Sequence, residues 1–246
     1  AVSATRLNSV NSYIGFKGKK TASGLTLGYD LQGVVNIDSS NGSSFLSEPR
    51  DAFVYVSHAQ LGTLQAGQQD TVYKMYGDKV RMLGVSSSNF VSSSNVASNP
   101  SWRGKGVSTS FNTRINGHLV WTSPRMNGFE VGYLLRQDPA KTATKNASLN
   151  SVGINWTDNK FYVGLAQETH DDYFAFSGSA STAAAGSVYN AAAGLRSKDT
   201  GTRLSFSYRD KGVRIGADTS TLKFTETSTQ VNGFKQHKFN TWQVTG

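Results

Sequence analysis

Apolar and polar residues alternate along short segments of this chain from one end to the other. Between positions 203 and 209, for example, leucine, phenylalanine and tyrosine alternate with arginine and serine. A side-chain period of two is the geometry of a β-strand with one apolar and one polar face. Repeated strands of about ten residues with this pattern, and with aromatic residues near their ends, are what a transmembrane β-barrel needs. The alternation therefore predicts an all-β fold, an antiparallel transmembrane β-barrel.

Twelve segments carry this pattern, and none shows a convincing helical period. The predicted strands are 11–19, 24–38, 50–58, 62–69, 113–123, 127–137, 148–157, 160–170, 186–197, 201–210, 212–224 and 236–245. Turn residues separate them, among others at Asp199 to Gly201 and at Asp210 to Gly212. Short turns alternate with longer polar stretches at 39–49, 138–147 and 171–185. This asymmetry is typical of outer-membrane barrels, whose short turns face the periplasm.

The composition suits a single β domain over residues 1–246 and excludes several classes of protein. Cysteine is absent, which removes disulfide scaffolds, cysteine zinc sites and thiol catalysis. No run of about eighteen apolar residues is present, so a transmembrane helix is excluded. The four histidines lie on different predicted strands, and the motifs of zinc proteases, serine hydrolases and nucleotide-binding proteins are missing. We therefore expect no enzymatic activity, no metal and no cofactor.

The chain has a formal net charge of +9, and its basic residues are spread over separate predicted strands. A nucleic-acid-binding protein would gather them on one face, whereas closure of a barrel would collect several around one interior. The spread favours a lumen for anions, with no nucleic-acid partner.

Lipid-facing positions such as Ile14 and Phe16 fix which side of each predicted strand points into the lumen. The polar lumen positions include Lys17, Asp30, Gln32, Arg114, His118, Glu130, Arg136, Glu168, Arg196, Arg203, Arg209 and Arg214. Rings of charged side chains set the ion preference of such pores, and arginine and lysine favour anions. The alternative is that several of these residues are solvated charges near the rims.

The segment 70–112 departs from the pattern, with little alternation and a middle that is rich in serine and asparagine. Structureless loops of this length are uncommon in a compact fold and are often functional. We expect this segment to fold into the barrel and narrow it as a constriction loop; the alternative is a loop outside the barrel. Its charged residues include Asp70, Lys74, Asp78, Lys79, Arg81, Arg103 and Lys105.

Several short motifs, in order along the chain, resemble those of one family. They are Ser12-Tyr13-Ile14-Gly15-Phe16-Lys17-Gly18, Arg50-Asp51-Ala52-Phe53-Val54, Leu61-Gly62-Thr63-Leu64 and Gly67-Gln68-Gln69, followed by Arg114, Leu119, Trp121, Thr122-Ser123-Pro124 and Gly128-Phe129. Each motif is weak by itself. Their order and spacing together resemble the Gram-negative general porins of the β-proteobacterial and neisserial type.

This resemblance implies a barrel of sixteen strands, of which about twelve are visible here, and a homotrimer in the bacterial outer membrane, in contact with lipid and lipopolysaccharide. It also implies that 70–112 is the constriction loop and that a first strand and the final strands lie beyond 1–246. Two positions depart from the family, because Tyr13 and Gln68 stand where it has arginines of the basic pore wall. Positive charge on 70–112 would replace the charge missing from that wall.

The function expected from these features is passive diffusion of small hydrophilic solutes, with a preference for anions, through a water-filled outer-membrane channel. Two alternatives remain. One is a substrate-specific outer-membrane channel in which aromatic residues such as Tyr13 and Tyr162 guide a sugar or an organic anion. The other belongs to a different class and is a soluble β-sandwich binding module.

Overall fold

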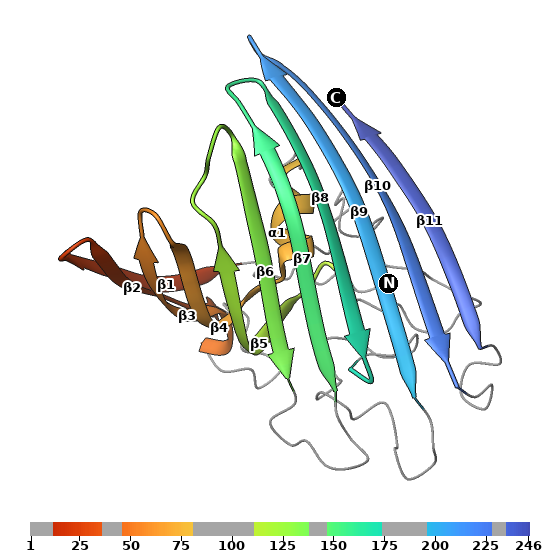
Figure 1. Cartoon of the computed structure of the whole chain (residues 1–246), viewed down its shortest axis with the longest axis horizontal. Helices are drawn as coiled ribbons and strands as arrows, with labels where there is room; N and C mark the ends of the chain where they lie inside the picture. Colours follow the sequence, from red (N-terminus) through yellow and green to blue (C-terminus); the bar gives the residue numbers. More distant parts are fainter. Residues whose placement is uncertain (1–11, 36–45, 81–110, 138–146, 174–195, 228–234) are drawn as a thin grey trace, which may run out of the picture.

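The computed structural model describes residues 12–35, 46–80, 111–137, 147–173, 196–227 and 235–246. Within them, eleven antiparallel strands form one sheet in which strand order follows chain order (Figure 1). The strands are β1 (Tyr13–Ala22), β2 (Leu25–Val35), β3 (Leu46–His58), β4 (Gly62–Asp70), β5 (Arg114–Thr122), β6 (Phe129–Gln137), β7 (Ser148–Thr157), β8 (Phe161–Asp171), β9 (Ser197–Asp210), β10 (Val213–Glu226) and β11 (Gln236–Thr245).

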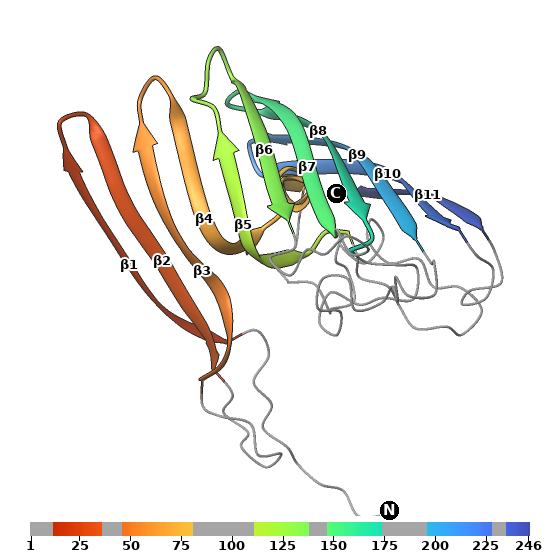
Figure 2. The ribbon, with the colours of Figure 1, turned by 60° about the horizontal axis from the view of Figure 1, so that its bottom comes forward.

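The predicted all-β antiparallel fold is confirmed by this sheet. β1 and β11 are its edges in the described part of the chain, so closure into a barrel and the number of sixteen strands stay predictions. Figure 2 shows the strands side by side, with β1 to β4 curving away from β5 to β11.

Tight turns join the paired strands at one end of the sheet. In the turn between β1 and β2, Ser23 and Gly24 have φ values of 49° and 79°, and the turn between β9 and β10 holds Lys211 and Gly212 in the same left-handed region. Between β7 and β8, the backbone N–H groups of Phe161 and Lys160 both donate to the carboxylate of Asp158. These hydrogen bonds lower the pKa of Asp158, which keeps this acceptor ionised.

The predicted turn at Asp199 to Gly201 is wrong, because these residues lie inside β9. Asp199 pairs with His170 of β8, and Gly201 pairs with Glu168. Gly201 is needed for packing, since a Cβ there would stand 2.7 Å from Cδ1 of Phe111. The predicted strand 186–197 therefore contributes only its last residue to β9, and 186–195 lies outside the described residues.

A short helix that the sequence pattern did not predict follows β4. Helix α1 (Val72–Gly77) runs into the 3-10 helix η1 (Asp78–Val80), and the hydroxyl of Thr71 caps it by accepting from the backbone N–H of Lys74. Six residues are too few to show a helical period, so the pattern missed them. Among the described residues, no helix has the length and apolar character needed to cross a membrane.

The two faces of the sheet differ sharply. One face is apolar and exposed; on it Ile154, Leu165 and Leu204 stand in one cross-strand row. On the opposite, inner face, α1 packs against β7, β8 and β9 (Figure 2). The buried core gathers there and consists of Val72, Tyr73, Tyr76, Phe111, Ile115, Val120, Leu134, Ala147, Leu149, Ala166, Tyr173, Leu222 and Phe224.

Two glycines let α1 approach the sheet closely. A Cβ at Gly153 of β7 would stand 2.7 Å from Cδ2 of Tyr76, and one at Gly132 of β6 would stand 2.7 Å from its hydroxyl oxygen. The phenol of Tyr162 meanwhile donates a hydrogen bond of 2.7 Å to the carbonyl oxygen of Tyr76. The ring of Tyr76 in α1 therefore packs directly on the backbone of β6 and β7, because glycine has no side chain at these two positions.

Substitution of Gly153 by valine is expected to push α1 off the sheet. Overpacking of this kind lowers the free energy of unfolding by about 1–3 kcal/mol, measurable by urea unfolding in lipid vesicles with tryptophan fluorescence. The matched control is Val152→Leu, because Val152 is the neighbouring residue on the exposed face and should tolerate the change. Equal stability of the two variants would contradict this packing.

Candidate channel-lining site

A chain of alternating charges crosses the inner face of the sheet. It begins at Asp51 of β3, whose carboxylate oxygen lies 2.6 Å from Nε of Arg114 at the start of β5. Arg114 reaches with Nη2 to Asp70 at the end of β4, at 3.1 Å. Asp70 in turn lies 3.1 Å from Nζ of Lys74 in α1. The entry to the 70–112 segment is therefore tied to two strands through carboxylates.

The same chain of charges continues from α1 to the far strands. Nζ of Lys74 lies 2.9 Å from Asp78, and Nη1 of Arg203 in β9 lies 3.6 Å from the other oxygen of Asp78. Nε of Arg203 donates to Asp218 of β10 at 2.8 Å, and its Nη2 also contacts that carboxylate. Nη1 of Arg203 donates to the side-chain oxygen of Asn112 at 2.6 Å. Both ends of the 70–112 segment thus meet one guanidinium.

Arg203 is fully buried, so its partners decide whether this arrangement is stable. A buried charge that loses its partner is strongly destabilising, because it has neither water nor an opposite charge. Gly77 supports the contact, since a Cβ there would stand 2.0 Å from Nη1 of Arg203. The ring of Tyr73 lies 5.8 Å from the guanidinium carbon, and burial raises the pKa of the Tyr73 phenol far above its ordinary value, which leaves the phenol neutral.

Most of the predicted basic lumen residues in this region are neutralised. The ion-pair chain holds three cations and four carboxylates, namely Arg114, Lys74 and Arg203 against Asp51, Asp70, Asp78 and Asp218. Lys17 of β1 is also paired, with its Nζ 2.6 Å from Asp30 of β2. These residues hold the inner face together and contribute little net positive field.

Arg209 and Arg214 are different. They face each other directly across β9 and β10, beside the tight turn, and both are exposed. The strand alternation places them on the inner face, because Tyr208 packs on Phe161 on the apolar side and Ile215 is exposed there. Within the described residues neither arginine has an ion pair. Because no carboxylate among the described residues pairs with either arginine, the two side chains present uncompensated positive charge. Like charges that face each other also repel.

Other predicted lumen residues have separate surroundings. His118 is buried on β5, and Glu130 forms an ion pair of 3.0 Å with Arg125 and accepts from Asn155. Nε of Arg136 donates to the carbonyl oxygen of Asn116 at 2.6 Å, and its guanidinium lies over the ring of Tyr173.

Arg196 is not on a strand, contrary to its predicted place within one. It precedes β9, pairs with Asp172, and exchanges hydrogen bonds with Thr227 at the end of the sheet opposite the tight turns. Lys79 is exposed in η1. Arg81, Arg103 and Lys105 lie outside the described residues.

The two aromatic residues named for the substrate-specific alternative have different surroundings. Tyr13 is exposed and has the guanidinium of Arg50 over its ring at 4.5 Å. Tyr162 is buried beneath α1 and bound to Tyr76. Tyr162 therefore supports the helix and has little surface to offer a solute.

Sequence reasoning missed the carboxylates Asp51 and Asp218 as partners. Asp218 points to the same inner face of β10 as Arg214. The strand alternation could have identified it as a partner, because an inner aspartate on a hairpin is placed to meet the inner Arg203 of the neighbouring strand. No local signal pointed to Asp51, which is 63 positions away from Arg114.

An apolar exposed face, a charged inner face and a segment packed on that inner face are features of channel-forming outer-membrane β-proteins. A family model described as Gram-negative porin matches residues 1–246. The chain therefore belongs to the Gram-negative porin family, whose members are non-enzymatic channels of the outer membrane. No curated protein matches it.

Solved structures show the same fold at low sequence identity. The anion-selective porin from Comamonas acidovorans is 17% identical, with a TM-score of 0.62 over 95% of this chain and 63% of that porin. OmpF of Salmonella typhi, in complex with daunomycin, is 13% identical, with a TM-score of 0.52 over 97% of this chain and 78% of OmpF. The chain thus spans less than two thirds of the length of the Comamonas porin.

Removal of Arg203 is expected to destabilise the protein strongly. Arg203→Met leaves Asp218 and Asp78 without their shared cation, which should lower the free energy of unfolding by about 3–5 kcal/mol. The double variant Arg203→Met with Asp218→Leu should recover part of this loss, since Asp218 is then no longer an unpaired charge and Asp78 keeps its ion pair with Lys74. Arg209→Met is the control, because an exposed, unpaired arginine should change stability by no more than about 0.5 kcal/mol. An Arg203→Met variant as stable as this control would refute the role assigned to Arg203.

Proposed function

We propose that the protein is an outer-membrane diffusion channel through which small hydrophilic solutes cross down their gradients, with anions preferred. Membership of the porin family and the apolar outer face support a water-filled channel. Sixteen strands, a homotrimer, and contact with lipid and lipopolysaccharide belong to the same proposal. They follow from the resemblance to general porins.

The observation that carries the anion preference is the pair of Arg209 and Arg214. Their positive charges face each other on the inner face without a carboxylate among the described residues, whereas Lys17, Arg114 and Arg203 are compensated. Uncompensated charge at a channel mouth raises the local concentration of the opposite ion. The preference of the Comamonas porin, whose name calls it anion-selective, points the same way.

Because Arg209 and Arg214 flank the tight turn, they lie at the end of the sheet that faces the periplasm in such barrels. The selectivity filter we propose is thus at the periplasmic mouth and is distinct from the ion-pair chain, which holds the 70–112 segment in place. We propose that this segment is the constriction loop. Support comes from α1, which packs on the inner face against β7 and β8.

Replacing both arginines is expected to weaken the anion preference. In a planar bilayer under a potassium chloride gradient, the unchanged protein should give stepwise ohmic openings with a reversal potential on the anion side. Arg209→Gln with Arg214→Gln should move that potential toward zero or beyond it, and the effect should shrink in high salt, where charges are screened.

The matched control is Lys17→Gln, since Lys17 is already neutralised by Asp30. Its reversal potential should stay on the anion side. Cation preference of the unchanged protein would contradict the proposed anion preference but not the channel function. A protein that stays soluble without detergent and gives no openings would contradict the channel function.

Loss of the α1 anchor is expected to widen the channel. Tyr76→Ala removes a buried ring that packs on Gly132 and Gly153, a change that costs about 3–5 kcal/mol in a core. Single-channel recordings should show larger and noisier openings than those of the unchanged protein. Met126→Ala serves as the control, because Met126 is exposed in the connection between β5 and β6. Unaltered conductance of Tyr76→Ala would place the constriction elsewhere.

A further inference from the structure

Three lysines lie close together on the outer, apolar face of β9, β10 and β11, strands that lie side by side in Figure 1. They are Lys198, Lys223 and Lys238, and we call them the outer lysine cluster. Lys223 pairs directly with Lys238, and Lys198 pairs with Thr225, two positions along β10 from Lys223. Paired residues have Cβ atoms about 5 Å apart, and diagonal neighbours are about 7–8 Å apart. The three ammonium groups can therefore reach one ligand.

The strand alternation places all three lysines on the outer face. Each lysine has the same parity as a large, exposed apolar residue of its own strand. These residues are Leu204 on β9, Ile215 on β10 and Trp242 on β11. The lysines themselves are exposed as well. The cluster thus belongs to the face that is expected to meet lipid and has no contact with the ion-pair chain of the inner face.

Protein carboxylates balance little of this charge. Nζ of Lys198 lies 3.7 Å from Asp171 of β8. Within the described residues, Lys223 and Lys238 form no ion pair. Like charges that are directly opposite destabilise a pair of strands. An anion bound between the lysines would remove this repulsion.

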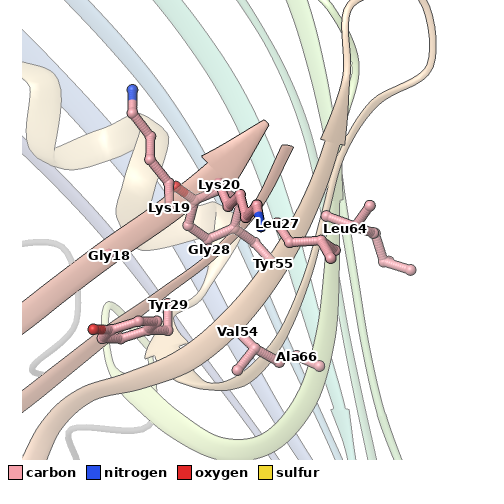
Figure 3. Close-up of a pocket in the computed structure, with 11 residues that line it drawn as sticks. Gly18, Lys19, Lys20, Leu27, Gly28, Tyr29, Val54, Tyr55, Leu64 and Ala66 are labelled. Carbon is pink, nitrogen blue, oxygen red and sulfur yellow. The ribbon is translucent and has the colours of Figure 1, made fainter. Parts of the chain in front are cut away.

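The outer face of β1 to β4 has no comparable cluster. A hollow of about 680 Å³ lies there (Figure 3), and Lys20 is the one outer-face lysine among its lining residues. Lys20 pairs with the apolar Leu27. A single cation among apolar residues gives no site for a multiply charged group, so the cluster on β9 to β11 is the stronger anion site of the two.

The position of the cluster can be measured along one strand at a time. From the tight turn onward, the outer residues of β9 are Tyr208, Phe206, Leu204, Thr202, Thr200 and Lys198. At about 3.3 Å per residue and a strand tilt of about 40°, the stretch from Tyr208 to Lys198 spans about 25 Å of membrane thickness. The apolar band of such barrels is also about 25 Å tall.

Lys198 therefore lies where the apolar band ends, on the side opposite the tight turns. On β10, Lys223 is separated from the exposed Val213 by the same length of strand. Tight turns face the periplasm in outer-membrane barrels. The outer lysine cluster is thus at the headgroups of the outer leaflet, which in Gram-negative bacteria contains lipopolysaccharide.

We propose that Lys198, Lys223 and Lys238 bind a phosphate group of lipid A, the phosphorylated and multiply acylated anchor of lipopolysaccharide, directly and without a bridging divalent cation. The lysines supply the charge that a divalent cation would otherwise supply. The acyl chains would lie on the apolar residues of the same strands, such as Leu204 and Trp242. This site rests on the proposed outer-membrane channel and is independent of its ion selectivity.

Native mass spectrometry of the full chain, purified from outer membrane and delipidated in detergent, can test the site. Diphosphorylated lipid A, dephosphorylated lipid A or phosphatidylglycerol is added at matched concentrations in the presence of EDTA. The unchanged protein should retain diphosphorylated lipid A several-fold more than either of the other two lipids. The triple variant Lys198→Gln, Lys223→Gln, Lys238→Gln should retain it no better than the dephosphorylated form.

The matched control is Lys211→Gln, because Lys211 is an exposed lysine in the tight turn of the same hairpin, at the opposite end. This variant should retain lipid A as the unchanged protein does. The triple variant should keep its channel openings and reversal potential. Loss of openings in the unchanged protein would contradict the channel and leave the retention result separate.

Four results would overturn the proposal. The first is equal retention of diphosphorylated lipid A by the triple variant and the unchanged protein. The second is loss of retention by the unchanged protein in EDTA, since a divalent cation would then bridge the lipid to the protein. The third is equal retention of phosphatidylglycerol, and the fourth is loss of subunit association in the triple variant, since a second copy would then occupy this face.

Discussion

The contact between Arg203 and Asp218 is the interaction on which the inner face depends. Arg203 is buried without solvent, and it joins β9 and β10 to both ends of the 70–112 segment through Asp78 and Asn112. In an environment of low dielectric constant such a pair is stable only when every partner is present. Three contacts hold α1 in place. They are the ion pairs of Arg203, the packing of Tyr76 on Gly153, and the hydrogen bond from the Tyr162 phenol to the carbonyl oxygen of Tyr76.

Pairing also changes which arginines can act on solutes. A count of charges along the chain suggests a broadly basic lumen, yet the geometry gives Lys17, Arg114 and Arg203 carboxylate partners. The field of such pairs falls off quickly, because opposite charges lie within a few ångströms of each other. Positive charge without such compensation stands at Arg209 and Arg214 in the described part of the chain. Arg114 and Arg203 thus have a structural role, and the anion preference that we propose rests on Arg209 and Arg214.

The outer face of the sheet carries two kinds of side chain. Its large exposed side chains, such as Trp121, Val152 and Leu204, are apolar, which suits hydrocarbon, whereas near the ends of β1 and β10 it carries Lys20 and Lys223. Charged residues near the ends of strands are compatible with a membrane because headgroups lie there. The sheet would therefore contact solutes on one face and hydrocarbon on the other.

The sequence by itself determined most strands of the sheet and which side of each strand is apolar, because a period of two is a local property of the backbone. It also indicated the family through motifs of β1 to β6. Tertiary structure decided three things that no local pattern contains: the continuity of β9 through Asp199 and Gly201, the helix α1, and the pairing of the cations. The physical reason is distance along the chain, since Arg114 meets Asp51 from 63 positions away and Arg203 meets Asn112 from 91.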